Sequence, residues 1–300
     1  LGISSANAGA INASIMVLGE TLELLVAGVV GYLSDRVGRK RIMVRGFLLA
    51  GLGAVIAPFS APIGGVVGGS GLTVYYVARM LMACGIGAVW PQLWTIGGDF
   101  SDQGNRARLM ANSAFMMALG KTLVYAILMQ IPPKGGVVLT MLLVAVAAFA
   151  GARLADTTMI DVGPKLLQPS VPWRRVRRLL QDDRRLRLSF AAGFLARSDM
   201  VITALFLMLW CVYFAEAAGV TREEAAAHGG MMVGLAGLVV MVSLPLWKAF
   251  IERFGRVASI AAAVALSGLG FVMVGLVANP FDPFIMLPVV VAATGQAGCF

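Results

Sequence analysis

The turn between the first two apolar segments of the chain reads Gly31-Tyr32-Leu33-Ser34-Asp35-Arg36-Val37-Gly38-Arg39-Lys40-Arg41. Gly31 lacks a side chain and would let another helix approach closely. Asp35 can accept hydrogen bonds from a helix N-terminus, where the helix dipole favours an anion, and Gly38 permits a tight reversal of the chain. An ordinary basic loop would explain the cations of this stretch but not the spacing Gly-x3-Asp-Arg-x-Gly-Arg. We therefore treat residues 31–41 as a specific motif rather than an ordinary loop.

The composition excludes an ordinary soluble protein. Of the 300 residues, 59% are hydrophobic and 13% are charged, and the mean hydropathy is +0.86. Soluble proteins have roughly 45–50% apolar and 25% charged residues. Because about 20 apolar residues in a helix cross a bilayer, the chain is predicted to be an all-α polytopic membrane protein. The expected spans are nine apolar segments, at residues 10–33, 43–62, 73–97, 109–131, 137–154, 188–214, 229–250, 257–278 and 284–300.

Lysine and arginine are distributed unevenly among the connections between these segments. The connections at 34–45, 98–108, 153–187 and 248–256 hold 19 of the 24 Lys and Arg residues. The positive-inside rule places them in the cytoplasm, as in a multi-pass protein of the bacterial inner membrane. The net charge of +9 then reflects topology, since a basic loop beside anionic lipid explains it. No nucleic-acid partner is expected.

Residues suited to catalysis or metal binding are few. The three cysteines, Cys84, Cys211 and Cys299, lie far apart in apolar runs without CxxC spacing, and His228 stands alone. Neither a disulfide framework nor a Cys/His zinc site fits this pattern, and no Ser/His/Asp or Cys/His constellation is visible. We expect no cofactor, no metal site and no enzymatic activity.

The motif at 31–41 has a weaker echo 217 residues later, in Lys248-Ala249-Phe250-Ile251-Glu252-Arg253-Phe254-Gly255-Arg256. Four residues of the echo, Glu252, Arg253, Gly255 and Arg256, match Asp35, Arg36, Gly38 and Arg39. Lys248 replaces the leading glycine. Both copies fall on the predicted cytoplasmic side, which indicates two parallel halves of similar construction.

These stretches resemble the signature loop of the major facilitator superfamily, which joins the second and third transmembrane helices of that family. The third span contains a similar signature of the family's fourth helix, Arg79-Met80-Leu81-Met82-Ala83-Cys84-Gly85-Ile86-Gly87, with Ala83 where glycine is usual. Asp99 resembles the acidic end of that helix. The fourth span, around 117–122, departs from the drug/proton antiporter branch because it lacks a Gly-Pro motif.

The resemblance covers essentially the whole chain and implies helices 2 to 9 and part of helix 10 of a two-bundle architecture, truncated at both ends. It divides the chain into an N-terminal bundle (1–154) without its first helix, a cytoplasmic basic linker (155–187) and an incomplete C-terminal bundle (188–300). It also implies that residues 31–41 are a gate motif, which forms a cytoplasmic latch in which Arg39 reaches Asp99. Asp35 would meet the start of helix 11, and with that helix absent we expect Asp35 to cap no helix N-terminus.

Ionisable residues inside spans are costly and mark transport pathways by default. Six are present: Glu20, Glu23, Arg79, Lys121, Arg197 and Asp199. We expect the three acids and Lys121 to line a central cavity in which at least one carboxylate carries protons. The alternative is structural pairing of these charges, with snorkelling of the long side chains.

The sequence thus predicts a secondary active transporter of a small polar solute, coupled to protons as in symport and working by alternating access. One alternative is a membrane scaffold or sensor of the same fold that does not transport. The substrate stays open, because the cations favour an organic anion whereas the acids favour a cation, including a metal such as iron. The expected partners are the lipid bilayer and a small molecule or ion, and the oligomeric state is left open.

Overall fold

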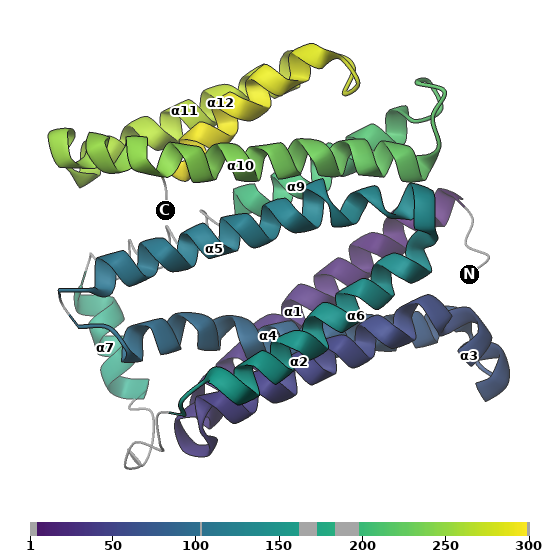
Figure 1. Cartoon of the computed structure of the whole chain (residues 1–300), viewed down its shortest axis with the longest axis horizontal. Coiled ribbons are helices and arrows are strands. Elements are labelled where there is room, and N and C mark those ends of the chain that lie inside the picture. The colour runs from purple at the N-terminus through teal and green to yellow at the C-terminus, as the bar shows by residue number, and fades with distance from the viewer. Residues whose placement is uncertain (1–4, 103, 162–172, 184–197, 299–300) are drawn as a thin grey trace. The chain divides into compact units, whose positions relative to one another are not determined.

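The computed structural model describes residues 5–102, 104–161, 173–183 and 198–298, and these residues form helices and short connections without a strand. The α-helices are α1 (Ser5–Val37), α2 (Arg39–Ile56), α3 (Ser60–Val67), α4 (Gly71–Asp99), α5 (Arg106–Ala126), α6 (Pro132–Thr158), α7 (Trp173–Asp182), α9 (Ser198–Phe214), α10 (Arg222–Phe254), α11 (Arg256–Leu276) and α12 (Met286–Ala297) (Figure 1). The predicted all-α class is confirmed.

The predicted spans coincide with apolar helices. Six helical segments in the described part are long and apolar enough to cross a membrane: Ala10–Val37, Arg39–Val67, Gly71–Asp99, Pro132–Thr158, Arg222–Phe254 and Val257–Leu276. The other three predicted spans contain shorter apolar helices, at Phe115–Gln130, Ala204–Phe214 and Pro283–Ala297. Many large apolar side chains on these helices are exposed, such as Leu24 and Val242. Such surfaces suit contact with lipid tails rather than water.

The chain divides into two compact units. Unit 1 consists of Leu1–Met110 and Gly135–Pro169, and unit 2 of Ala111–Lys134 and Ser170–Phe300. The predicted N-terminal bundle includes residues 111–134, which here cluster with unit 2. The predicted boundaries at 154 and 188 stay a prediction.

Glycines on α10 explain why α5 packs in unit 2. A Cβ on Gly234 would lie 2.6 Å from Cβ of Ala126, and one on Gly230 would lie 2.9 Å from Cβ of Met129. Both distances are shorter than real carbon atoms tolerate, so the two helices approach to a distance that only glycine permits. At the end of this interface, Nε2 of Gln130 donates to the carbonyl oxygen of Ala227 over 2.8 Å.

In unit 1, α2 and α4 pack through glycines. A Cβ on Gly85 of α4 would lie 2.5 Å from both the Ala50 nitrogen and the Gly46 oxygen of α2. A Cβ on Gly53 of α2 would lie 2.5 Å from the Ala78 oxygen and 2.6 Å from Cγ of Met82. Backbone therefore lies directly on backbone along this interface.

In unit 2, α11 and α12 repeat this packing in the same register. A Cβ on Gly295 of α12 would overlap the Ser267 nitrogen and lie 2.7 Å from the Ala263 oxygen of α11. Ser267 and Ala263 lie 217 positions after Ala50 and Gly46. Gly270, 217 positions after Gly53, likewise meets the backbone of Ala292. The internal repeat inferred from the gate motif therefore extends to the helix packing within each unit.

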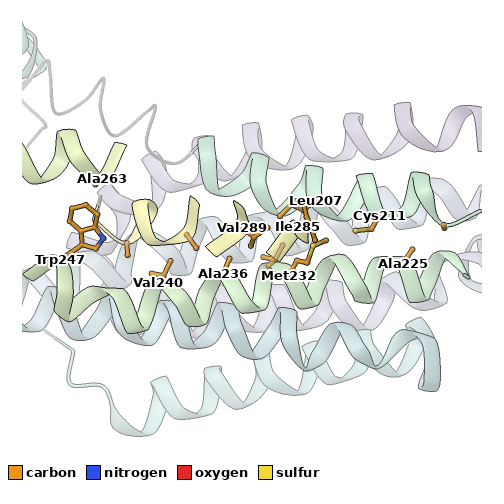
Figure 2. Close-up of a cluster of buried hydrophobic side chains, with 14 residues drawn as sticks. Leu207, Cys211, Ala225, Met232, Ala236, Val240, Trp247, Ala263, Ile285 and Val289 are labelled. Carbon is orange, nitrogen blue, oxygen red and sulfur yellow. The ribbon is translucent and has the colours of Figure 1, made fainter. Parts of the chain in front are cut away.

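The core of unit 2 is a buried apolar cluster on α9, α10, α11 and α12 (Figure 2). Met232 and Cys211 are fully buried in it. Trp247 closes one end of the cluster, where its Nε1 donates to the Thr294 oxygen over 2.6 Å. The cluster holds the four helices together without an ionised group.

Candidate functional site

The gate motif forms the turn between α1 and α2. Gly38 has φ 101° and ψ 140°, a conformation that costs little only for glycine. Its nitrogen donates to the Ser34 oxygen over 3.1 Å, which closes the end of α1. A Cβ on Gly38 would also lie 2.9 Å from Cγ of Asp161. The predicted reversal at Gly38 is confirmed, and the structure adds the carboxylate that lies against it.

Arg39 and Asp99 form an ion pair between α2 and the end of α4. Nε of Arg39 lies 2.7 Å from Oδ2 of Asp99, and the two side chains are only 10% and 12% exposed. The predicted contact is therefore present. Asp35 lies 3.4 Å from Nη2 of Arg39 but is 65% exposed.

The end of α6 supplies two further carboxylates to this turn. Oδ1 of Asp156 lies 3.5 Å from Nζ of Lys40, and Oδ2 of the same residue lies 4.0 Å from Nη1 of Arg153. Asp161 follows α6 and lies beside Gly38. Sequence reasoning missed both acids. The available signal was their position directly after the last apolar residues of a predicted span.

The expected close approach of another helix at Gly31 stays a prediction. A Cβ at Gly31 would meet no described atom within 4 Å. The described contact of α1 with α4 lies on a different face, where a Cβ on Gly87 would lie 3.0 Å from Cα of Glu23.

The repeat motif forms an equivalent turn with a different charge arrangement. Gly255 has φ 81° and ψ 164°, and its nitrogen donates to the Ile251 oxygen over 2.9 Å. Glu252 lies 3.9 Å from Nζ of Lys248, with both side chains largely exposed. Arg253 lies over the ring of Phe254, 5.4 Å from its centre. Arg256 begins α11. The backbone of the turn is thus repeated, whereas no buried ion pair accompanies it among the residues described there.

Three of the six intramembrane charges lie on α1 and α4. Glu23 is half-buried at the crossing with Gly87, and Glu20, one turn earlier, is exposed. Arg79 is half-buried, with Nη1 4.0 Å from Sδ of Met82. Within the described part of unit 1, no ion pair joins Glu20 to Arg79.

The other three charges fall in or before unit 2 helices. Lys121 is half-buried on α5. It lies beside Thr122, whose Oγ1 would overlap a Cβ on Gly237 of α10. Asp199 is the second residue of α9. Arg197 lies outside the described residues. That these charges line one cavity with Glu20 and Glu23 stays a prediction.

A buried amide in α4 was not identified from the sequence. Gln92 is fully buried, and neither its Nε2 nor its Oε1 has a hydrogen-bond partner among the described residues. It directly follows Pro91, which lies inside the helix. The usable signal was a polar side chain beside a proline within an apolar span.

Unit 2 contains a cavity of about 760 Å³. Its lining residues come from α9 to α12 and the connection after α11, and are Phe206, Leu207, Leu209, Trp210, Tyr213, Ala236, Phe271, Val274, Gly275, Val277, Ala278, Val289, Ala292, Ala293 and Gln296. Among the described residues, no charged side chain lines it. Among the residues that the structure covers, no three His, Cys, Asp or Glu side chains are grouped to hold a metal ion.

Comparison with known proteins was made by sequence and by structure. The family model described as Major Facilitator Superfamily matches residues 1–300. The chain is 55% identical over 300 residues to "Magnetosome protein MamH" of Paramagnetospirillum magneticum, covering all of this chain and 69% of that protein. It is 41% identical to "Magnetosome protein MamZ" of Magnetospirillum gryphiswaldense, of which it spans 47%, about half.

Solved transporters share the fold. The partially occluded, inward-open xylose transporter XylE of E. coli aligns with a TM-score of 0.64 at 14% identity, over 99% of this chain and 73% of that one. A peptide transporter POT aligns with a TM-score of 0.59 at 17% identity, over 96% of this chain and 71% of that one. At such low identity the likeness concerns the fold alone.

Proposed function

This chain belongs to the Major Facilitator Superfamily, and on that premise we propose that it serves in a secondary active transporter for a small polar solute, coupled to protons. The family and its structural neighbours support a transporter. Two bundles would rock about a site near the middle of the membrane, as in other transporters built from repeats. Substrate and coupling are the parts of the proposal that need a test.

The observation that carries the proposal is the carboxylate pair on α1. Glu20 and Glu23 lie three residues apart in a helix that is otherwise apolar through its middle. Arg79 is the one basic residue of the neighbouring α4 and lies in its third turn. A carboxylate inside a membrane can bind and release a proton or a cation.

The cytoplasmic turn supports alternating access. A buried Arg39–Asp99 ion pair and the Lys40–Asp156 contact hold the start of α2 to the ends of α4 and α6. Such charge-assisted contacts tie helices into a unit that moves as one body. We propose that the turn serves as the cytoplasmic latch.

Two substrate classes remain in the proposal. The helices α1 and α4 together carry two acids, Glu20 and Glu23, and one arginine, Arg79. This excess of acidic residues favours a cation, including a metal ion such as iron, over an organic anion as the substrate. Because the curated relatives are magnetosome proteins, we further propose that the protein resides in a magnetosome membrane rather than only in the bacterial inner membrane.

The test is transport by the full-length protein in proteoliposomes with an imposed proton gradient. The probes are ferrous ion and succinate, followed by isotope uptake and by a pH-sensitive dye inside the vesicles. We expect Glu20→Gln and Glu23→Gln to reduce proton-coupled uptake at least tenfold, an effect equivalent to about 1.4 kcal/mol. Glu216→Gln, in the exposed turn after α9, is the matched control and should transport normally.

If both Gln variants took up the probe as the wild type does, Glu20 and Glu23 would have no role in proton coupling. Uptake of neither probe, with correctly folded protein, would favour the alternative of a scaffold or sensor.

A further inference from the structure

The connection between α6 and α9 contains a basic amphipathic helix. The helix α7 reads WRRVRRLLQD over Trp173–Asp182. With 100° between successive residues, the positions of its four apolar residues fall within one arc of about 120°. These are positions 173, 176, 179 and 180. The four arginine positions, 174, 175, 177 and 178, occupy the rest of the circumference.

Most of the described side chains of α7 are exposed. Arg174, Arg177 and Arg178 are exposed. On the apolar side, Leu179 is 51% exposed and Leu180 is half-buried. An exposed leucine beside a row of arginines is the pattern of a helix that lies in the interface of a membrane.

The position of α7 in the chain brings it to one particular surface. It lies between the apolar helices α6, which ends at Thr158, and α9, which begins at Ser198. The two stretches of chain that join α7 to α6 and to α9 therefore each begin at a helix expected to lie in the membrane. The 153–187 connection holds nine Lys and Arg residues, so the positive-inside rule places α7 at the cytoplasmic leaflet. That leaflet carries anionic lipid headgroups, which attract juxtamembrane arginines.

We propose that α7 is a membrane-surface anchor that binds the phosphates of anionic lipids in the cytoplasmic leaflet. Leu179 and Leu180 insert between the headgroups, while the arginines form charge-assisted hydrogen bonds with lipid phosphate oxygens. Bound in this way, α7 divides the long connection into two shorter tethers. The anchor is separate from the transport pathway and does not depend on the identity of the solute.

The first experiment measures the depth of α7 in the bilayer. The full-length protein, with all native cysteines replaced by alanine, receives a spin label at Leu179→Cys or, as a control on the opposite face, at Arg177→Cys. Each form is placed in nanodiscs of phosphatidylcholine alone or with one third phosphatidylglycerol. We expect the label at position 179 to collide with oxygen and avoid a nickel chelate only in the anionic nanodiscs. The label at position 177 should stay accessible to nickel in both.

The second experiment tests the charge requirement with the label at position 179. Replacing Arg174, Arg175, Arg177 and Arg178 together by Gln should lower the ratio of bound to free α7 on the order of a thousandfold, because each basic residue near the surface contributes to binding. Replacing the same four by Lys is the matched control and should retain anionic binding.

Three results would overturn the anchor. The first is equal burial of the label in phosphatidylcholine. The second is unchanged burial in the four-Gln variant. The third is protection of position 179 only after RNA or an acidic protein is added, since α7 would then bind a soluble macromolecule and not the leaflet.

Discussion

Arg39 illustrates how a single residue of the gate motif acquires its role. Its guanidinium is 90% buried and lies 2.7 Å from the Asp99 carboxylate. At this burial the charge of either residue is poorly solvated, so each depends on the other. Asp35 lies 3.4 Å from the same guanidinium but is largely exposed to solvent. Its ion pair with Arg39 should therefore contribute little to the stability of the fold.

Loss of either partner of this ion pair should destabilise the protein. We expect Asp99→Asn and Arg39→Ala each to cost about 3–5 kcal/mol, because a buried charge is left without its partner. Asp35→Asn is the control and should cost under about 1 kcal/mol. Thermal unfolding of the purified protein in detergent, followed by circular dichroism, measures the difference.

Equal unfolding midpoints for Asp99→Asn and Asp35→Asn would show that the ion pair does not stabilise the fold.

At the scale of elements, glycine sets the distance between helices. Gly85 and Gly295 occupy equivalent positions in the α2/α4 and α11/α12 interfaces, with backbone atoms of the facing helix directly over them. Gly51 of α2 meets the ring of Phe149, whereas Gly268, 217 positions later on α11, meets no described atom within 4 Å. Among the described residues, the contact of α2 with α4 is therefore repeated between α11 and α12. The contact of Gly51 with Phe149 has no counterpart at Gly268.

This register predicts opposite effects of the same substitution. Gly85→Ala and Gly295→Ala should each lower stability by about 1–3 kcal/mol, because the added methyl overlaps backbone and forces the helices apart. Gly268→Ala should raise stability by about 0.5–1 kcal/mol through the higher helix propensity of alanine. The unfolding midpoint in detergent, measured for the three variants together, gives the sign of each effect.

A stabilised Gly85→Ala variant would be incompatible with the backbone contact. A strongly destabilised Gly268→Ala variant would mean that this face of α11 is covered in the complete protein.

At the scale of the whole molecule, topology follows from charge. The positive-inside rule places the α10/α11 turn in the cytoplasm and the connection between α9 and α10 on the other side. Glu252 and Glu216 are exposed residues of these two connections. They therefore provide a matched pair for probing the orientation.

A membrane-impermeant maleimide should distinguish the two positions. In a cysteine-free form of the full-length protein, we expect Glu216→Cys to be labelled in intact spheroplasts. Glu252→Cys should be labelled only after permeabilisation. The reverse pattern would invert the orientation and with it the cytoplasmic placement of the latch and of α7.

Several features were predictable because they are local or compositional. The spans follow from the length of apolar runs, and the reversals at Gly38 and Gly255 follow from a residue type that alone adopts positive φ at little cost. The Arg39–Asp99 contact was predictable only through the family resemblance, since the two residues lie 60 positions apart. Asp156 and Asp161 were missed because nothing in their local sequence says which turn they meet.

By itself, then, the sequence determined the class of protein, the positions of the spans and the two glycine turns. The solvation of apolar groups and the backbone freedom of glycine act within short stretches, so these features are predictable without knowledge of the fold. Only the tertiary structure decided that α5 packs on α10, that Gly87 lies against Glu23, and which acids surround the gate motif. These depend on which distant helix faces meet, and backbone contacts such as Gly85 on Ala50 settle that register.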